Sequence, residues 1–196
     1  MFKSITRGAA FVLALAAVSS GPAHAADEHE ARLREIVQTK IMPFVRRSIV
    51  VDSVNTQNRE HASLNARQIS RLDKIWKDEV KRAGGALINE VLASPLSNYL
   101  KQVKQANGNL FTEIYVMDNK GLNVGQTDIT PDYWQGDEGK WQKTFLSGIG
   151  SVRIGKIKKH KSTGKRQSRV TVTIVDPSTN RVIGAVTIGV NADELG

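Results

Sequence analysis

A short segment in the second half of the sequence concentrates side chains that could bind a small molecule. Its members are Asp132, Tyr133, Trp134, Asp137, Lys140 and Trp141. Aromatic walls with a few fixed polar groups are typical of small-ligand pockets. A carboxylate would pair with a ligand's ammonium group, and a ring face would add cation–π attraction. The segment therefore predicts a site for an amine or an amino acid, whose own carboxylate Lys140 or Arg153 could hold.

The same residues also have a purely structural interpretation. Trp134 and Trp141 could be anchors of a hydrophobic core. The carboxylate of Asp137 could simply favour a helix N-terminus, where the helix dipole stabilises negative charge. The sequence favours the core role for Trp141, and both interpretations stay open for the other members of the segment.

Three residues on expected strands could line the same pocket. Glu113 and Tyr115 lie on the less apolar side of an alternating segment, and Arg153 could bind an anionic group of a ligand. A tyrosine on a strand is more often simply packed, and Arg153 could equally lie on a solvated face. The predicted ligand-binding residues are Asp132, Tyr133, Trp134, Asp137, Lys140, Tyr115 and Arg153.

The sequence lacks the motifs of catalysis and metal binding. Its 4 histidines lack the closely spaced partners that zinc ligands need. No Gly-x-Ser-x-Gly elbow occurs, and residues 163–165 (TGK) lack the rest of a phosphate-binding loop. Asp132 with Asp137 or Glu138 could form the carboxylate pair of a glycosidase, but a domain of this size rarely builds a sugar cleft. We expect a protein that is not an enzyme and has no metal or cofactor.

Residues 1–25 have the layout of a secretory signal peptide. Lys3 and Arg7 precede an apolar run over residues 9–18, and Ala23-His24-Ala25 forms a small-x-small cleavage site. The run is shorter than the roughly 20 residues of a membrane-spanning helix. The chain contains 0 cysteines, which is compatible with a bacterial periplasm. We expect cleavage near Ala25 and a periplasmic protein, and an uncleaved anchor is the alternative.

The formal net charge is +9 at pH 7, and much of the excess lies in one expected hairpin. Its cations are Lys156, Lys158, Lys159, Lys161, Lys165, Arg166 and Arg169. A basic protein attracts anions, but export argues against nucleic acid as the partner. The hairpin could be a solvated strand pair whose charges prevent edge-to-edge aggregation. Alternatively, it could dock an acidic partner or a membrane surface.

Apolar residues at three- and four-residue steps predict long helices in the first half of the chain. The first stripe covers residues 33–49, and Pro43 should kink or divide it. Asn65 with Gln68 has the pattern of a capping box, and Ser94-Pro95 marks another helix start. We expect residues 26–106 to be mostly helical.

From about residue 110 the pattern changes to the alternation of strands. A hairpin turns at residues 118–121, a loop and a short helix over 137–146 follow, and three strands fill residues 151–190. Helices followed by antiparallel strands indicate an α+β fold. We expect long N-terminal helices packed on a five-stranded antiparallel sheet, with residues 110–117 beside the last strand. Residues 26–196 should form a single domain, in which residues 110–190 contain the sheet.

Three segments resemble extracytoplasmic Cache sensor domains, which are also described as PAS-like. Residues 114–121 (IYVMDNKG) resemble the first hairpin of these domains, and residues 132–138 (DYWQGDE) the acidic-aromatic stretch before their short helix. Residues 175–177 and 183–190 resemble their last hairpin. The resemblance implies a PAS-like sheet and a small-molecule pocket between sheet, loop and short helix. It also implies that the long N-terminal helix can pack against a second copy, and it names no ligand.

The sequence therefore predicts a freestanding periplasmic sensory module of Cache type. It would bind a small molecule, have no output domain of its own, and report to a membrane receptor or kinase. A homodimer through the N-terminal helix would fit this function, and nucleic acid would not be a partner. The alternative is a structural or adaptor protein with a Cache-like fold and no ligand, which uses the basic hairpin or the long helix as its interaction surface.

Overall fold

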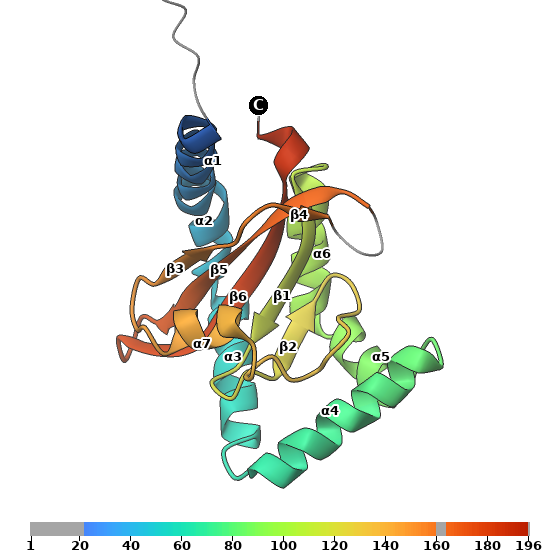
Figure 1. Cartoon of the computed structure of the whole chain (residues 1–196). Coiled ribbons are helices and arrows are strands. Elements are labelled where there is room, and N and C mark those ends of the chain that lie inside the picture. The colour runs from blue at the N-terminus through green and yellow to red at the C-terminus, as the bar shows by residue number, and fades with distance from the viewer. Residues whose placement is uncertain (1–21, 160–163, 196) are drawn as a thin grey trace, which may run out of the picture.

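A computed structural model of the chain describes residues 22–159 and 164–195. An antiparallel sheet forms its centre, with long helices on one face and a short helix on the other (Figure 1). The expected α+β class is confirmed. The sheet has 6 strands instead of five, because the segment that we expected as one strand after residue 151 forms two short ones.

The helical elements precede the first strand, except for one short helix between the second and third strands and a 3-10 turn after the last strand. The helical elements are α1 (Pro22–Ile36), a π-helical turn η1 (Val37–Ile41), α2 (Met42–Val45), α3 (Ser48–Glu60), α4 (Ala66–Lys81), α5 (Ala86–Ala93), α6 (Pro95–Ala106), α7 (Gly139–Phe145) and a 3-10 turn η2 (Ala192–Glu194). The strands are β1 (Phe111–Met117), β2 (Asn123–Gln126), β3 (Val152–Ile154), β4 (Lys158–Lys159), β5 (Arg166–Asp176) and β6 (Arg181–Asn191). Their order is β2-β1-β6-β5-β3, and β4 also pairs with β5. The strand beginning at residue 111 thus lies beside the last strand, as expected.

We expected Pro43 to kink or divide the first helix, but the helix ends a few residues later, before Arg47. The helix passes through the π-helical turn η1 and continues into α2, where Pro43 lies at the second position. Proline has no backbone N–H to donate to the preceding turn, and the helix departs from regular α geometry in the π-helical turn just before Pro43. The chain leaves helical geometry at Arg47, whose extended backbone precedes α3.

Two predicted helix starts are confirmed. Asn65 accepts a hydrogen bond from the backbone N–H of Gln68, and the Gln68 side chain accepts one from the backbone N–H of Asn65. Ser94 caps α6 through the backbone N–H of Ser97 at 3.1 Å. Such caps satisfy backbone donors that have no partner within the helix.

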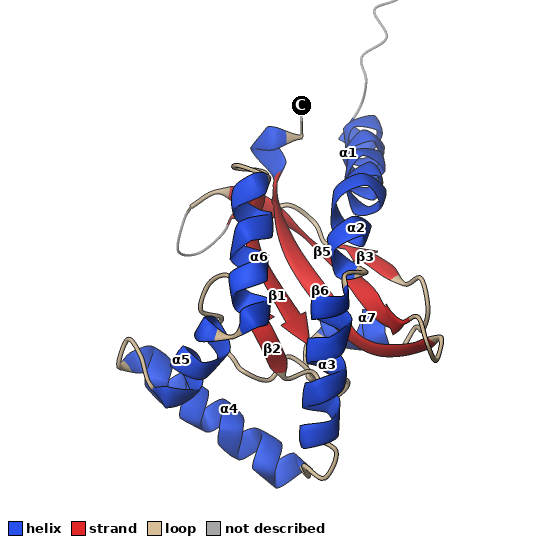
Figure 2. Cartoon of the chain, turned by 180° about the vertical axis from the view of Figure 1, so that it is seen from behind, coloured by secondary structure: helices blue, strands red, loops and turns tan. Residues whose placement is uncertain are grey.

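One face of the sheet forms the main hydrophobic core. Its strand residues are Phe111, Ile114, Val116, Val124, Val170, Val172, Ile174, Ile183, Val186, Ile188 and Val190. Helices α3 and α6 lie across this face (Figure 2), and η1 and α2 add further aliphatic side chains. A second cluster surrounds Trp76 of α4 and includes Tyr133 from the loop after β2.

The expected signal peptide lies almost entirely outside the described residues, and only residues 22–25 appear, at the start of α1. Lys161 of the basic hairpin also lies outside them. Within the described ranges, no helix is both long enough and apolar enough to cross a membrane.

Candidate functional site

The sheet face beneath α7 carries a row of polar side chains that crosses five strands. Cross-strand partners in an antiparallel pair point to the same face of the sheet. The register places Gln126 opposite Tyr115, Tyr115 opposite Thr187, Thr187 opposite Thr171, and Thr171 opposite Arg153. Gln126 and Thr187 are 0% exposed, Thr171 is 1% and Tyr115 is 2%. A buried face with a polar residue on every strand is unlike an ordinary core.

The row contains both fixed and uncommitted groups. The hydroxyls of Thr171 and Thr187 lie 2.9 Å apart. Burial raises the pKa of the Tyr115 phenol and the nearby Glu113 carboxylate raises it further, so the hydroxyl stays protonated at neutral pH. Arg153 is half-buried, and its guanidinium makes no hydrogen bond or ion pair with any residue that the structure describes.

A charged group lies beside the row on the same face. The Nε of Arg169 donates to Glu113 Oε1 at 2.7 Å, and the Nε2 of Gln167 donates to the same oxygen at 3.0 Å. Burial lowers the pKa of Arg169, but its hydrogen bond and charge interaction with Glu113 outweigh this and raise it. The face therefore presents a fixed carboxylate and a fixed guanidinium next to neutral hydroxyls.

Helix α7 covers the other end of this face with aromatic side chains. Trp141 stacks on Phe145 at a ring distance of 4.7 Å, and both pack with Tyr115 and its neighbours. The Lys140 ammonium lies 5.5 Å from the centre of the Tyr115 ring and pairs with Glu138 at 2.8 Å. The contact between α7 and the sheet is thus mainly aromatic, and the charged groups of Lys140 and Glu138 lie beside it.

Buried polar atoms without a partner lie on β2 and on α7. Within the described part of the chain, Gln126 Nε2, Asn123 Oδ1 and Thr144 Oγ1 form no hydrogen bond. Leaving such a group unpaired typically costs about 1–3 kcal/mol, so most buried polar atoms in proteins are paired. The described part of the chain thus leaves three buried polar atoms unpaired on β2 and α7.

The predicted aromatic segment packs elsewhere, against α4. The ring of Tyr133 stacks on Trp76 at 5.4 Å. Asp73 of α4 accepts hydrogen bonds from the backbone N–H groups of Tyr133 and Trp134 at 3.0 and 3.1 Å. The loop is therefore attached to α4 both through its own backbone N–H groups and through the Tyr133 ring.

Asp132 is also committed to α4, through an ion pair with Lys77 at 3.0 Å. Lys77 pairs at the same time with Asp73 at 2.6 Å. The hydrogen bonds to Asp73 and Asp132 raise the pKa of Lys77, so its charge persists throughout the physiological range. The Asp132 carboxylate thus has a cationic partner within the chain itself.

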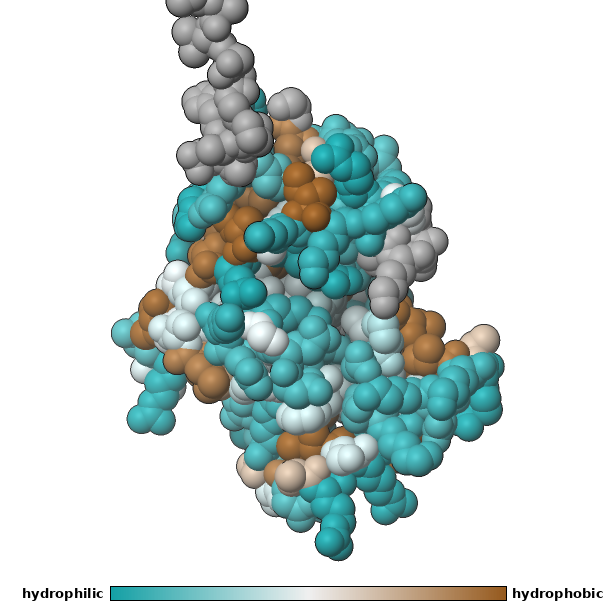
Figure 3. All heavy atoms as spheres, in the orientation of Figure 1, coloured by the Kyte–Doolittle hydropathy of each residue, from teal (hydrophilic) through white to brown (hydrophobic). Residues whose placement is uncertain are grey.

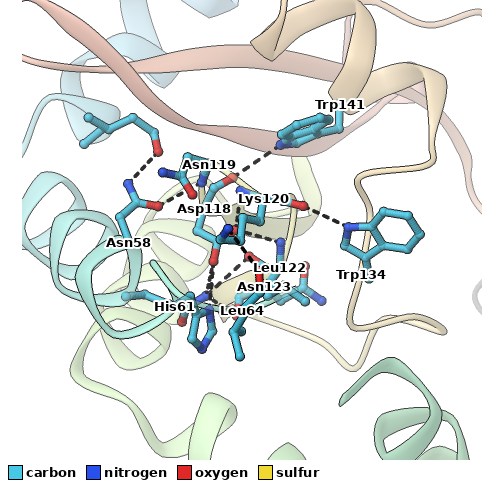
Figure 4. A network of polar contacts seen from close by, with 12 residues as sticks. Asn58, His61, Leu64, Asp118, Asn119, Lys120, Leu122, Asn123, Trp134 and Trp141 are labelled. Atoms are coloured by element: carbon cyan, nitrogen blue, oxygen red, sulfur yellow. Dashed lines mark hydrogen bonds and ion pairs between the residues drawn. The ribbon is translucent and has the colours of Figure 1, made fainter. Parts of the chain in front are cut away.

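The turn between β1 and β2 is built around the buried carboxylate of Asp118 (Figure 4). Its Oδ1 accepts hydrogen bonds from the backbone N–H groups of Lys120 and Leu122 at 2.8 and 2.9 Å. Its Oδ2 accepts one from Gln57 Nε2 at 3.0 Å and lies 3.0 Å from His61 Nδ1. The carboxylate therefore closes the turn and joins it to the C-terminal half of α3.

Two indole groups hold the backbone of the same turn (Figure 4). Trp134 Nε1 donates to the carbonyl of Lys120 at 2.8 Å, and Trp141 Nε1 donates to the carbonyl of Asp118 at 3.3 Å. Both tryptophans are thus structural anchors of the turn, which is the role that the sequence favoured for Trp141.

The seven predicted residues divide into two groups. Tyr115, Lys140 and Arg153 lie on or above the polar face of the sheet, and Asp137 is exposed just before α7. The remaining three, Asp132, Tyr133 and Trp134, lie together at α4. No group of acidic and histidine side chains in the described residues is arranged to hold a metal ion.

Sequence reasoning assigned no binding role to several members of the polar face. Glu113 was considered as a pocket residue, but Arg169 was assigned to the basic hairpin, and Gln126, Thr171 and Thr187 had no role. The alternation of threonine with valine along β5 was the available signal, because it turns the threonines away from the core. Cross-strand register, which brings them beside Tyr115 and Arg153, is not visible in the sequence.

Comparison with known proteins gives structural matches only. No protein-family model matches the chain, and no curated protein matches it significantly by sequence. Among solved structures, the sensor domain of the V. cholerae histidine kinase DctB has a TM-score of 0.38 and 11% identity, over 86% of this chain and 57% of that one. The Campylobacter jejuni chemoreceptor Tlp3 ligand-binding domain, in complex with 4-methylisoleucine, has a TM-score of 0.40 and 12% identity, over 90% and 65%. The extracellular domain of vpHK1S-Z8, named as a histidine kinase, has a TM-score of 0.45 and 12% identity, over 88% and 59%.

The chain thus spans between 57% and 65% of the length of these three domains. The ligands of those proteins are their own, and the function proposed below depends on the contacts within this chain. The three matched domains come from a chemoreceptor and two histidine kinases, and each has a TM-score below 0.5 to this chain.

Proposed function

We propose that this chain is a sensory module that binds a small polar molecule between α7 and the polar row of the sheet. The observation that carries the proposal is the row itself, which places one polar side chain on each of five strands of a covered face. The opposite face of the same strands is filled by valine and isoleucine. Packing alone explains the aliphatic face, whereas buried hydroxyls, an amide and a guanidinium suit recognition.

The charges of the face favour a zwitterionic ligand such as an amino acid. Arg153 has no partner in the described residues, and a guanidinium binds a carboxylate through two parallel hydrogen bonds. The Glu113 carboxylate, which already accepts hydrogen bonds from Arg169 and Gln167, would share its charge with the ligand's ammonium group. The rings of Tyr115 and Trp141 supply an apolar wall. Tyr115, Lys140 and Arg153 would contact the ligand, with Asp137 at the mouth of the site.

In this proposal Asp132, Tyr133 and Trp134 position the loop and do not touch the ligand. Their backbone and side-chain bonds to α4 and to the β1–β2 turn support that role. We further propose that the module works in the periplasm after removal of residues 1–25. It would report to a separate membrane receptor or kinase, and the leader-like layout of residues 1–25 supports this location.

A thermal-shift screen of the purified protein against amino acids, amines and organic acids tests the proposal. A ligand present at about 100 times its Kd should stabilise the protein by about 2.7 kcal/mol and raise the melting temperature by several degrees. Arg153→Ala and Thr171→Val should weaken binding at least tenfold. Arg181→Ala, at an exposed position on the same sheet, is the matched control and should bind normally.

Two outcomes would overturn the assignment. Binding that survives Arg153→Ala and Thr171→Val but is lost in Trp134→Ala would place the ligand at the α4 loop. The absence of any ligand across the panel would favour the adaptor function, and the basic hairpin would then be tested for partner binding.

A further inference from the structure

A hollow lies along the edge of the sheet, between β5 and the helical elements η1 and α2. It is an open groove with a volume of about 400 Å³. Val37, Met42 and Val45 form its helical wall, and Val172 and Val175 of β5 form its floor. Val172 points to the helical face, and Thr173 and Val175 also line the groove, so the groove follows the edge of β5. Figure 3 shows brown, apolar surface in this region, between α2 and the β3 edge.

Three structural features keep this groove open instead of filled by side chains of the core. Strand β3 pairs with β5 only as far as Val172, so the residues of β5 beyond it form an edge. The helical wall begins in the π-helical turn η1, and such turns are frequent at functional sites. The third wall is the loop before β3, where Ile149 is 58% exposed between two glycines of positive φ, Gly148 at 86° and Gly150 at 76°.

The groove has one charged side chain among the residues that line it, Arg46 at its rim. Arg46 is exposed and makes no side-chain hydrogen bond or ion pair with any described residue. The volume lies within the range of about 300–1,000 Å³ that is typical of small-molecule sites. Apolar walls with one cation at the rim are complementary to a molecule that has a hydrocarbon chain and an anionic end.

We propose that this groove binds an amphipathic carboxylate, such as a medium-chain fatty acid. The chain would lie against Val37, Met42, Val45 and Val175, and the carboxylate would pair with Arg46. This site is separate from the polar face beneath α7 and does not depend on the function proposed for that face.

Titration calorimetry of the purified protein with octanoate, decanoate and dodecanoate, each below its micelle concentration, tests the chain contact. Each added methylene should tighten binding about fourfold until the groove is filled. Decanol and decylamine are the matched probes for the anionic end. Decanoate should bind at least tenfold more tightly than decanol, and decylamine should bind most weakly.

Variants then locate the site. Arg46→Glu should weaken decanoate at least tenfold and leave decanol unchanged, whereas Arg46→Lys should retain most of the affinity. Arg82→Glu, at an exposed position after α4, is the control and should have no effect. Val175→Trp should fill the groove and abolish binding. If that variant loses its circular dichroism signal, Ile149→Glu tests the same wall at an exposed position that tolerates charge.

Several results would overturn the proposal. One is equal affinity for decanoate and decanol, and another is decanoate binding that persists in both Val175→Trp and Ile149→Glu. A dimer detected by light scattering and dissociated by Ile149→Glu would show that a second copy of the chain occupies the groove instead. Binding of a zwitterion at the polar face should be unchanged in Ile149→Glu, so failure of one proposal is distinguishable from failure of the other.

Discussion

The two faces of the central sheet are made by alternate residues of the same strands, yet they differ in almost every chemical respect. Along β5, Val170 and Val172 enter the core beneath α3 and α6, while Thr171 and Thr173 point towards α7. On β6, Ile188 and Thr187 divide in the same way. The two faces have the same backbone and strand register, and both are buried, so they differ only in the chemistry of their side chains. One face provides the apolar burial that stabilises the fold, and the other retains polar groups that a ligand can use.

This comparison predicts that substitutions on the two faces separate into different classes of effect. Changes on the helical face should lower stability and leave ligand preference unaltered. Changes on the α7 face should alter binding at little cost in stability.

The largest effect is expected for Ile188→Ala on the helical face. Ile188 is 0% exposed, and removal of its buried carbons should lower the free energy of unfolding by about 2–5 kcal/mol. Urea denaturation measures this loss. A loss below about 1 kcal/mol would mean that this face packs loosely, because a well-packed site cannot collapse around the missing atoms.

Val170→Thr should have the next largest effect. It changes little in volume but places a hydroxyl among aliphatic side chains, which should cost about 1–3 kcal/mol. The same denaturation experiment measures it. Equal stability of Val170→Thr and the wild type would contradict the idea that only one face accommodates hydroxyl groups.

Thr171→Val is the converse change on the neighbouring residue and should cost only about 1 kcal/mol. The Thr187 hydroxyl loses one partner but retains Tyr115, with which it also forms a hydrogen bond. Ligand binding, in contrast, should fall at least tenfold. A stability loss as large as that of Ile188→Ala would show that the polar row is primarily structural.

The smallest effect is a dependence on pH at the end of β5. Hydrogen bonds from the Ser178 hydroxyl and backbone N–H, and one from Asn55 of α3, lower the pKa of Asp176 below its ordinary value. Its contribution to stability is therefore present above the unfolded pKa of 3.8 and is lost as the pH falls through the folded pKa. In Asp176→Asn, the melting temperature should therefore fall less steeply as the pH is lowered below about 4 than it does in the wild type. Thr171→Val, which removes no titratable group, should leave that dependence on pH unchanged.

Much of the fold was predictable from the sequence because its signals are local. The capping box at Asn65, the start of α6 at Ser94 and the alternation along β5 each depend on residues a few positions apart. Those signals, with the turn at residues 118–121, were sufficient for the fold class, and an antiparallel sheet of such strands allows the pairing of β1 with β6 that the structure has.

The candidate site was less predictable because its contacts are distant in sequence. The aromatic segment beside α7 suggested a pocket, but the partners of Asp132 and Tyr133 lie on α4, far upstream. Thr171 and Thr187 face Tyr115 only through strand register. The segment after residue 151 was expected as one strand, but its pairing with β5 lapses between Ile154 and Lys158, and it forms two short strands.

The turn at Asp118 has a mechanical consequence for the whole module. Trp141 of α7 holds the carbonyl of this residue, while Gln57 of α3 and His61, which follows α3, hold its carboxylate. Helix α7 on one face and α3 on the other are thus fastened to the same residue from opposite sides of the sheet. A displacement of α7 must either break the indole hydrogen bond or carry the turn, and with it the end of α3. The turn thus connects the two helices directly. A movement of α7 can reach the end of α3 through Asp118 without a change in the shape of the sheet.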